Sequence, residues 1–219
     1  MSRERTLSTS RLLAGVVSAA CMVGLASAAP GEAAGRSSCA PRGARTVLAN
    51  QQVQLYQRAT TLYGCANKGT KPVRITPYLG RKCTQLQGCG PLGPVAIGGR
   101  FVTYGFNEYT RQGSEGELYV LDLLKRRRVR VWRGGDLTGT GPTAGVASAV
   151  VSPTGRAAWI TDTTNVPSGR RVDVHVDRGQ GDTIVDTAGP EIDAESLSLG
   201  SSGTVYWTHD GEPRATSLR

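Results

Sequence analysis

The stretch VASAVVSPTGRAAWI, at residues 146–160, holds two runs of small, β-branched and aromatic residues separated by Ser152-Pro153-Thr154-Gly155-Arg156. β-Branched and aromatic residues favour strands, whereas Pro and Gly in close succession favour a tight turn. Each run has the length of a strand and is too short for a typical helix. The stretch therefore predicts two antiparallel strands joined by a turn at Gly155.

Similar short runs fill the chain on both sides of this hairpin. They are interrupted by Gly, Pro, Asn and Asp, and no apolar period of about 3.6 residues persists for three turns. The runs group into four units of similar build, at about residues 46–76, 95–132, 146–188 and 192–219. A single sheet of this kind cannot bury both of its faces, so neighbouring sheets have to stack on it. We expect one all-β domain at residues 46–219 with about four antiparallel sheet units.

The turn in the third unit carries a resemblance to a known family. Ser152-Pro153-Thr154-Gly155-Arg156, followed by Ala158-Trp159, resembles the S-P-D-G-x signature of the WD40-like, TolB-type β-propeller repeat, although Thr154 stands where Asp is usual. The same scheme of a Gly turn followed by an aromatic residue recurs at Gly98–Tyr104 and Ser201–Trp207. The resemblance implies a β-propeller-like fold whose Trp residues pack in or between the sheets. Because the chain has fewer units than most members of the family, a partial propeller that dimerises and a two-sheet β-sandwich are the alternatives.

The N-terminus has the features of a secretory signal peptide. Three arginines precede an Ala-rich apolar run, Leu12–Leu25, and Ala26-Ser27-Ala28 fits the small-residue rule for cleavage. We predict a signal peptide at residues 1–28, export through the general secretory route, and a flexible segment at residues 29–45. The apolar run has 14 residues, fewer than the roughly 20 that span a bilayer, so we expect no membrane span after cleavage.

Cys21 offers a different interpretation of this leader. Ser18-Ala19-Ala20-Cys21 resembles a lipoprotein cleavage box, but it lacks the usual Leu at the first position. The alternative localisation is therefore an envelope lipoprotein anchored at Cys21.

Four cysteines remain after the leader, and an even number in an exported chain indicates disulfide bonds. Three connectivities exist, of which we favour Cys39 with Cys65 and Cys83 with Cys89, because residues 81–93 form one loop that a short bridge would close. Zinc is disfavoured, since the chain has no C-x-x-C pair and its two histidines lie far downstream.

The chain is basic, and its positive charge is densest at one predicted turn. The formal net charge is +9 for the whole chain, and removing residues 1–28 lowers it to +7. A run of cations is a candidate patch for an anionic partner: Lys125, Arg126, Arg127, Arg128, Arg130 and Arg133. The alternative is a solvated turn followed by edge-strand charges that prevent aggregation. Nucleic acid is not expected as a partner, because aromatic residues are few and no binding motif occurs.

One predicted strand places three polar residues on the same face. Asp173, His175 and Asp177 alternate with valines, and a carboxylate-histidine-carboxylate set at this spacing can hold a divalent metal ion. Such a row is more often the solvated face of an edge or outer strand, which is the interpretation that we favour. An acidic loop, Glu191 to Glu195, is likewise expected to be solvated rather than to bind calcium.

The sequence lacks the common signatures of catalysis. It contains no G-x-S-x-G elbow, no H-E-x-x-H pair and no Gly-rich phosphate loop, and it has only two histidines. We assign no catalytic or metal-binding residue and no cofactor. We expect a secreted, non-catalytic binding or scaffold module whose partner is a protein or an anionic envelope polymer. The alternatives are a secreted hydrolase or lyase that uses loop carboxylates with a histidine, and a lipid-anchored envelope component.

Overall fold

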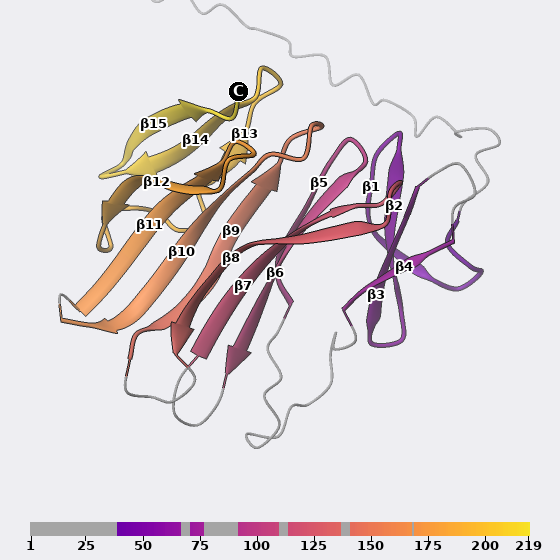
Figure 1. Ribbon diagram of the computed structural model, residues 1–219, viewed down its shortest axis with the longest axis horizontal. Helices are drawn as coiled ribbons and strands as arrows, with labels where there is room; N and C mark the ends of the chain where they lie inside the picture. Colours follow the sequence, from indigo (N-terminus) through magenta and orange to yellow (C-terminus); the bar gives the residue numbers. More distant parts are fainter. Residues whose placement is uncertain (1–38, 67–70, 77–91, 110–113, 137–140, 168) are drawn as a thin grey trace, which may run out of the picture. The chain divides into compact units, whose positions relative to one another are not determined.

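The strands of this chain pair into four separate antiparallel sheets. The computed structural model describes residues 39–66, 71–76, 92–109, 114–136, 141–167 and 169–219, all of them within one compact unit, Arg36–Arg219. These residues contain fifteen strands and no helix (Figure 1). The prediction of an all-β fold with about four antiparallel sheet units is confirmed, and this arrangement is consistent with the β-propeller-like form and with the alternative β-sandwich.

Within each sheet, strands that are consecutive in the chain pair with one another. The first sheet contains β1 (Arg45–Ala49), β2 (Val53–Arg58), β3 (Thr61–Ala66) and β4 (Val73–Thr76). The second contains β5 (Leu92–Gly98), β6 (Phe101–Tyr109), β7 (Ser114–Asp122) and β8 (Arg127–Asp136). The third contains β9 (Thr143–Val151), β10 (Ala157–Val166), β11 (Gly169–Asp177) and β12 (Asp182–Ala188). The fourth contains β13 (Ser198–Leu199), β14 (Thr204–His209) and β15 (Glu212–Ser217).

The turn between β9 and β10 has the hairpin geometry that its sequence predicts. The Gly155 amide donates to the Ser152 carbonyl at 3.0 Å, and the Ser152 amide donates to the Arg156 carbonyl at 2.8 Å. Gly155 has a φ of +88°, and a Cβ atom there would lie 2.7 Å from the ring of Phe101. Glycine is therefore required at this position both by the left-handed backbone and by packing against the second sheet.

The first strands of the second and third sheets approach each other through their backbones. A Cβ atom on Gly98, the last residue of β5, would lie 2.0 Å from the carbonyl oxygen of Val151, the last residue of β9. β5 also contacts β1, and β9 also contacts β13. The first strands of consecutive sheets are thus neighbours, as the inner strands of propeller blades are.

Three hydrophobic clusters lie between consecutive sheets. The first joins β2–β4 to the second sheet through residues such as Leu55 and Leu121. Another packs Leu118 and Val120 of the second sheet against Trp159 of the third, and the last packs Val174 of the third sheet against Trp207 of the fourth. Among the described residues, no cluster joins β13–β15 to β1–β4. Trp159 and Trp207 are buried, so these two indoles are core residues as expected.

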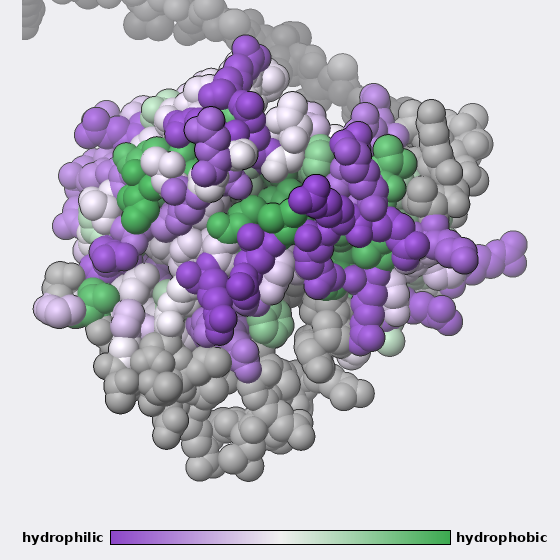
Figure 2. All heavy atoms as spheres, in the orientation of Figure 1, coloured by the Kyte–Doolittle hydropathy of each residue, from purple (hydrophilic) through white to green (hydrophobic). Residues whose placement is uncertain are grey.

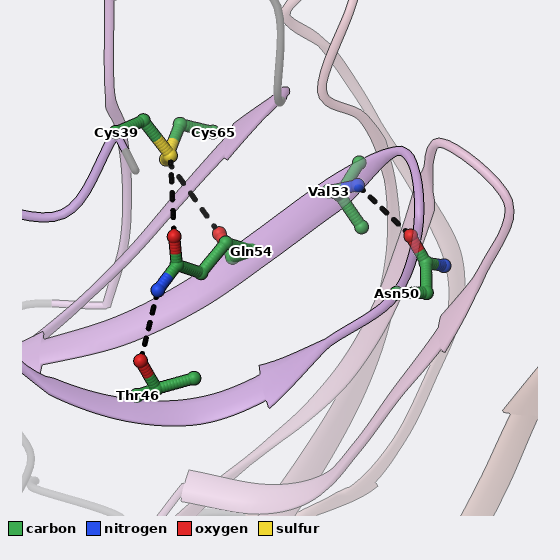
Figure 3. Close-up of a disulfide and its surroundings, with 6 residues drawn as sticks. All are labelled: Cys39, Thr46, Asn50, Val53, Gln54 and Cys65. Carbon is green, nitrogen blue, oxygen red and sulfur yellow. Dashed lines mark hydrogen bonds between the residues drawn. A yellow bond between two sulfur atoms is a disulfide. The ribbon is translucent and has the colours of Figure 1, made fainter. Parts of the chain in front are cut away.

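A disulfide bond ties the N-terminal lead-in to β3. Cys39 and Cys65 are bonded, with their Cα atoms 6.3 Å apart, and the Gln54 side chain lies beside them while donating to Thr46 Oγ1 at 2.8 Å (Figure 3). The pairing of Cys39 with Cys65 is therefore confirmed. Residues 39–44, which were expected to be flexible, are held at Cys39 by this bond. The predicted Cys83–Cys89 pair lies outside the described residues.

The described part of the chain contains no helix that is long and apolar enough to cross a membrane. The predicted signal peptide, Cys21 and residues 29–38 lie outside it.

Candidate functional site

The basic run begins in the tight turn between β7 and β8. Asp122 shapes this turn, because its Oδ1 atom accepts hydrogen bonds from the amides of Leu124 and Lys125, each at 3.0 Å. Arg126 has a φ of +56°, which lets the chain reverse direction. Lys125, Arg126 and Arg127 are exposed as a result.

Arg128 is exposed, but its guanidinium also takes part in the contact between the first two sheets. Its guanidinium lies over the rings of Tyr104 and Tyr119, at 5.5 and 5.6 Å from their centres. It also donates to the carbonyls of Arg74 at 3.2 Å and Ile75 at 3.4 Å. These contacts join β8 to β4, so Arg128 has a structural role.

Arg130 and Arg133 are paired with carboxylates of the adjacent strand β7. Arg130 Nη1 donates to Glu117 Oε1 at 2.8 Å, and Arg133 makes a two-point contact with Glu115. The hydrogen bond to Glu115 raises the pKa of Arg133, and the negative charge of Glu115 acts in the same direction. Both arginines therefore have a partner within this chain.

Lys125, Arg126 and Arg127 form the unpaired part of the predicted patch, which we call the cationic turn. Within the described residues, none of these three side chains makes a hydrogen bond or an ion pair; the Lys125 contact with Asp122 is made by its backbone amide. An exposed cation without an internal partner is available to an external anion. The six predicted residues thus divide into three whose side chains have partners within the chain and three whose side chains have none among the described residues.

A pocket of about 670 Å³ opens beside the cationic turn, between the second and third sheets. Lys125, Arg127, Arg130 and Arg100 line it from the second sheet. Its opposite wall comes from the β9–β10 and β11–β12 turns of the third sheet. Hydrophobic patches lie among hydrophilic side chains on the face of the molecule shown in Figure 2. The lining of this pocket also contains both kinds of side chain.

The two carboxylates in this pocket are already engaged. Asp122 Oδ2 lies 3.0 Å from Arg100 Nε, while Asp177 Oδ1 accepts from the amides of Gly179 at 2.6 Å and Gly181 at 3.2 Å. Arg130 is paired with Glu117 and Arg100 with Asp122. The unpaired cations Lys125 and Arg127 outnumber the one remaining carboxylate of the lining, Asp177, so the pocket keeps an excess of positive charge. A negatively charged group is the complement of this arrangement.

A β-bulge changes which face of β8 carries Trp132. Strict alternation along β8 would place Trp132 on the face of Arg128 and Arg130, opposite Val129. In the structure Tyr119 pairs with Arg130 but Leu118 pairs with Trp132, so the register shifts by one residue. Trp132 therefore packs against the cluster between the second and third sheets, as the resemblance implies for the Trp residues, because a one-residue shift exchanges the faces of a strand.

Asp173, His175 and Asp177 share a face, but that face is not solvated along its length. β11 is an interior strand, between β10 and β12, and Asp173 and His175 are buried. The expected solvated edge is therefore wrong. Asp173 accepts hydrogen bonds from Arg171 at 2.8 Å and Thr187 at 2.5 Å.

His175 has partners that the alternating pattern does not indicate. Its Nδ1 atom lies 2.8 Å from Asp182 Oδ1, and its Nε2 atom lies 3.1 Å from the hydroxyl of Thr161. The imidazole also stacks on Trp159, with ring centres 5.0 Å apart. The structure thus pairs His175 with Asp182, the first residue of β12, and not with Asp173.

The second histidine also pairs with a strand aspartate. His209 Nδ1 lies 2.9 Å from Asp186 Oδ2, which accepts a further hydrogen bond from Trp207 Nε1 at 2.7 Å. This pair joins β12 of the third sheet to β14 of the fourth. In the acidic loop, Asp193 Oδ1 accepts from the Glu195 amide, and Glu191 accepts from the Gly189 amide.

Within the part of the chain that the structure covers, no three His, Cys, Asp or Glu side chains are placed to hold a metal ion. No protein-family model matches the chain, and no curated protein matches it.

Proposed function

We propose that this chain is an exported, non-catalytic binding module that holds an anionic envelope polymer at its cationic turn. The observation that carries the proposal is the contrast within the basic run: Arg128, Arg130 and Arg133 are held by the protein's own groups, whereas Lys125, Arg126 and Arg127 are not. Unpaired cations beside one another attract a polyanion through their combined field.

The WD40-like, TolB-type repeat family is part of this proposal. Its support is the turn at Ser152–Arg156, which joins two strands as the repeat requires, and the stacking of sheets through their apolar faces. A binding role through loops at the ends of the sheets suits such a scaffold, although a shared fold does not by itself determine function.

Export rests on the leader at residues 1–28 and on the Cys39–Cys65 bond, since disulfides persist in oxidising compartments. The mass of the mature protein, purified from its native host, tests this step. We expect an N-terminus at Ala29. A lipid-modified Cys21 would instead establish the envelope-anchored form, and an intact leader would contradict export.

Binding of polyphosphate, measured by calorimetry at low and at high salt, tests the site. The triple variant Lys125→Gln/Arg126→Asn/Arg127→Gln removes the cationic turn, and Asn suits the positive φ of residue 126. At about 1 kcal/mol for each cation near an anionic surface, affinity should fall by at least about 10-fold. Higher salt should weaken binding by the unmodified protein, because exposed charges are screened.

A matched variant controls for net charge. Arg42→Asn/Arg45→Gln/Lys71→Gln removes three exposed cations from the first sheet and its lead-in, and it should bind polyphosphate within about 2-fold of the unmodified protein if the site is local. Equal losses in the two variants would show that only net charge matters, and would overturn the proposed site.

A hydrolase or lyase has less support from the arrangement of the histidines. His175 is buried, with its side chain only 4% exposed, and neither histidine lines the pocket beside the cationic turn. The loop carboxylates expected to work with a histidine, such as Glu191 and Asp193, accept hydrogen bonds from backbone amides of their own loop.

A further inference from the structure

The pocket beside the cationic turn has an apolar floor that a polyanion alone does not explain. Phe101, Val120, Val129 and Val131 line it from the second sheet. Val129, on the outermost strand of its sheet, is 44% exposed. An exposed apolar surface inside a concave site is typical of a binding site for a small molecule.

The opposite wall is built largely from backbone. Gly179 and Gly181 line the pocket from the β11–β12 turn, and a Cβ atom at either position would have no neighbour within 4 Å. Gly155 lines it from the β9–β10 turn and packs on the ring of Phe101. The absence of side chains at these three positions keeps the space above the apolar floor open.

The positive charge lies at one side of this apolar space. Lys125 and Arg127 line the pocket without an internal partner, next to Val129. Arg100 contributes a third cation, which lies over the ring of Phe101 at 5.0 Å and beside Asp122. Lys125 and Arg127 outnumber the carboxylate of Asp177, so the pocket favours an anion such as a phosphate monoester, which carries between about one and a half and two negative charges near neutral pH.

We infer that this pocket binds a small amphiphilic anion, a phosphate monoester of a single alkyl chain, with its phosphate at Lys125 and Arg127 and its chain on Phe101, Val129 and Val131. The volume of about 670 Å³ lies within the usual range for small-molecule sites. The inference rests on the proposed function in so far as both use the cationic turn, and it adds the apolar part of the ligand.

Calorimetry with octyl phosphate, below its critical micelle concentration, tests the inference on the mature protein. Inorganic phosphate probes the contribution of the charged group alone, and octyl glucoside probes the contribution of the alkyl chain alone. Octyl phosphate should bind at least about 10-fold more tightly than either, because only it satisfies both parts of the pocket. Equal affinities for octyl phosphate and inorganic phosphate would overturn the inference, as would binding only to phosphatidylglycerol vesicles.

Val129→Ser removes apolar surface without changing charge, and Val47→Ser is its control, because Val47 is 42% exposed on β1. Val129→Ser should weaken octyl phosphate binding by about 3-fold or more while leaving polyphosphate binding unchanged, and Val47→Ser should change neither. Circular dichroism and thermal unfolding check that both variants fold. If polyphosphate binds and octyl phosphate does not, the inference of an amphiphile site is rejected and the proposed function stands. If octyl phosphate binds and polyphosphate does not, only the proposal of a polymer partner is rejected.

Discussion

The Nδ1 atom of His175 lies 2.8 Å from a carboxylate oxygen of Asp182, seven residues further along the chain. An ionised carboxylate only accepts hydrogen bonds, so Nδ1 carries the proton, and in the neutral ring Nε2 accepts from the hydroxyl of Thr161. The same ring stacks on Trp159, with the two planes 6° apart. A histidine with all of its groups engaged in this way is a buried structural element of the third sheet.

We expect Asp182→Ala to destabilise the protein by about 1–3 kcal/mol, because it leaves the buried Nδ1–H group of His175 without a partner. Urea unfolding near neutral pH measures this change. Glu195→Ala is the control, since Glu195 is exposed, and it should cost less than about 0.5 kcal/mol. If the two variants are equally stable, the His175–Asp182 contact has no structural role.

We expect the protein to lose stability in acid through Asp186. Burial alone would raise the pKa of this carboxyl, but hydrogen bonds from His209 and Trp207 outweigh burial, and the pKa lies below its usual value of 3.8. A depressed pKa in the folded state stabilises the protein at higher pH, and this stabilisation disappears as the pH falls through the folded-state value.

Unfolding measured between about pH 5 and about pH 2 should therefore show a smaller pH dependence in Asp186→Asn than in the unmodified protein. Glu212→Gln, in the exposed first position of β15, should keep the original slope. An unchanged slope in Asp186→Asn would contradict the role assigned to the His209 contact.

We expect Gly155→Ala to be more harmful than the same change at another glycine with a similar backbone. Gly155 and Gly169 have φ values of +88° and +93°, but a new Cβ atom meets Phe101 only at residue 155, and nothing lies within 4 Å at residue 169. Gly169→Ala should cost about 1 kcal/mol from backbone strain, and Gly155→Ala should cost at least about 1 kcal/mol more through overpacking.

Thermal or urea unfolding gives both values, and Phe101→Leu combined with Gly155→Ala tests the contact directly. The double variant should recover part of the additional loss. If Gly155→Ala and Gly169→Ala cost the same, the Phe101 ring moves aside freely and the contact does not constrain the turn.

We expect removal of the Cys39–Cys65 bond to lower the free energy of unfolding. The bond closes a loop between cysteines 26 residues apart, and a native disulfide of this kind contributes about 2–4 kcal/mol. Cys39→Ser/Cys65→Ser should show this loss in urea unfolding. Peptide mapping without reductant should recover the two cysteines in one linked peptide, and free thiols at both positions would contradict the structure.

The amino-acid sequence by itself determined the all-β class, the number of sheets and the turn at Gly155. These features depend on residues close together in the chain: β-prone runs and the Gly and Pro residues between them. The four cysteines that follow residues 1–28 also allowed the Cys39–Cys65 bond. Alternation also placed Asp173 and His175 on one face of a strand correctly.

Only the tertiary structure decided what these faces contact. Burial of His175 follows from the position of β11 inside its sheet and from the second sheet that covers it, and the face of Trp132 follows from a bulge in its pairing with β7. The division of the basic run depends on partners such as Ile75, 53 residues before Arg128. The spacing of residue types along the sequence indicates local conformation. Burial, strand register and charge pairing depend instead on which distant strands lie against each other.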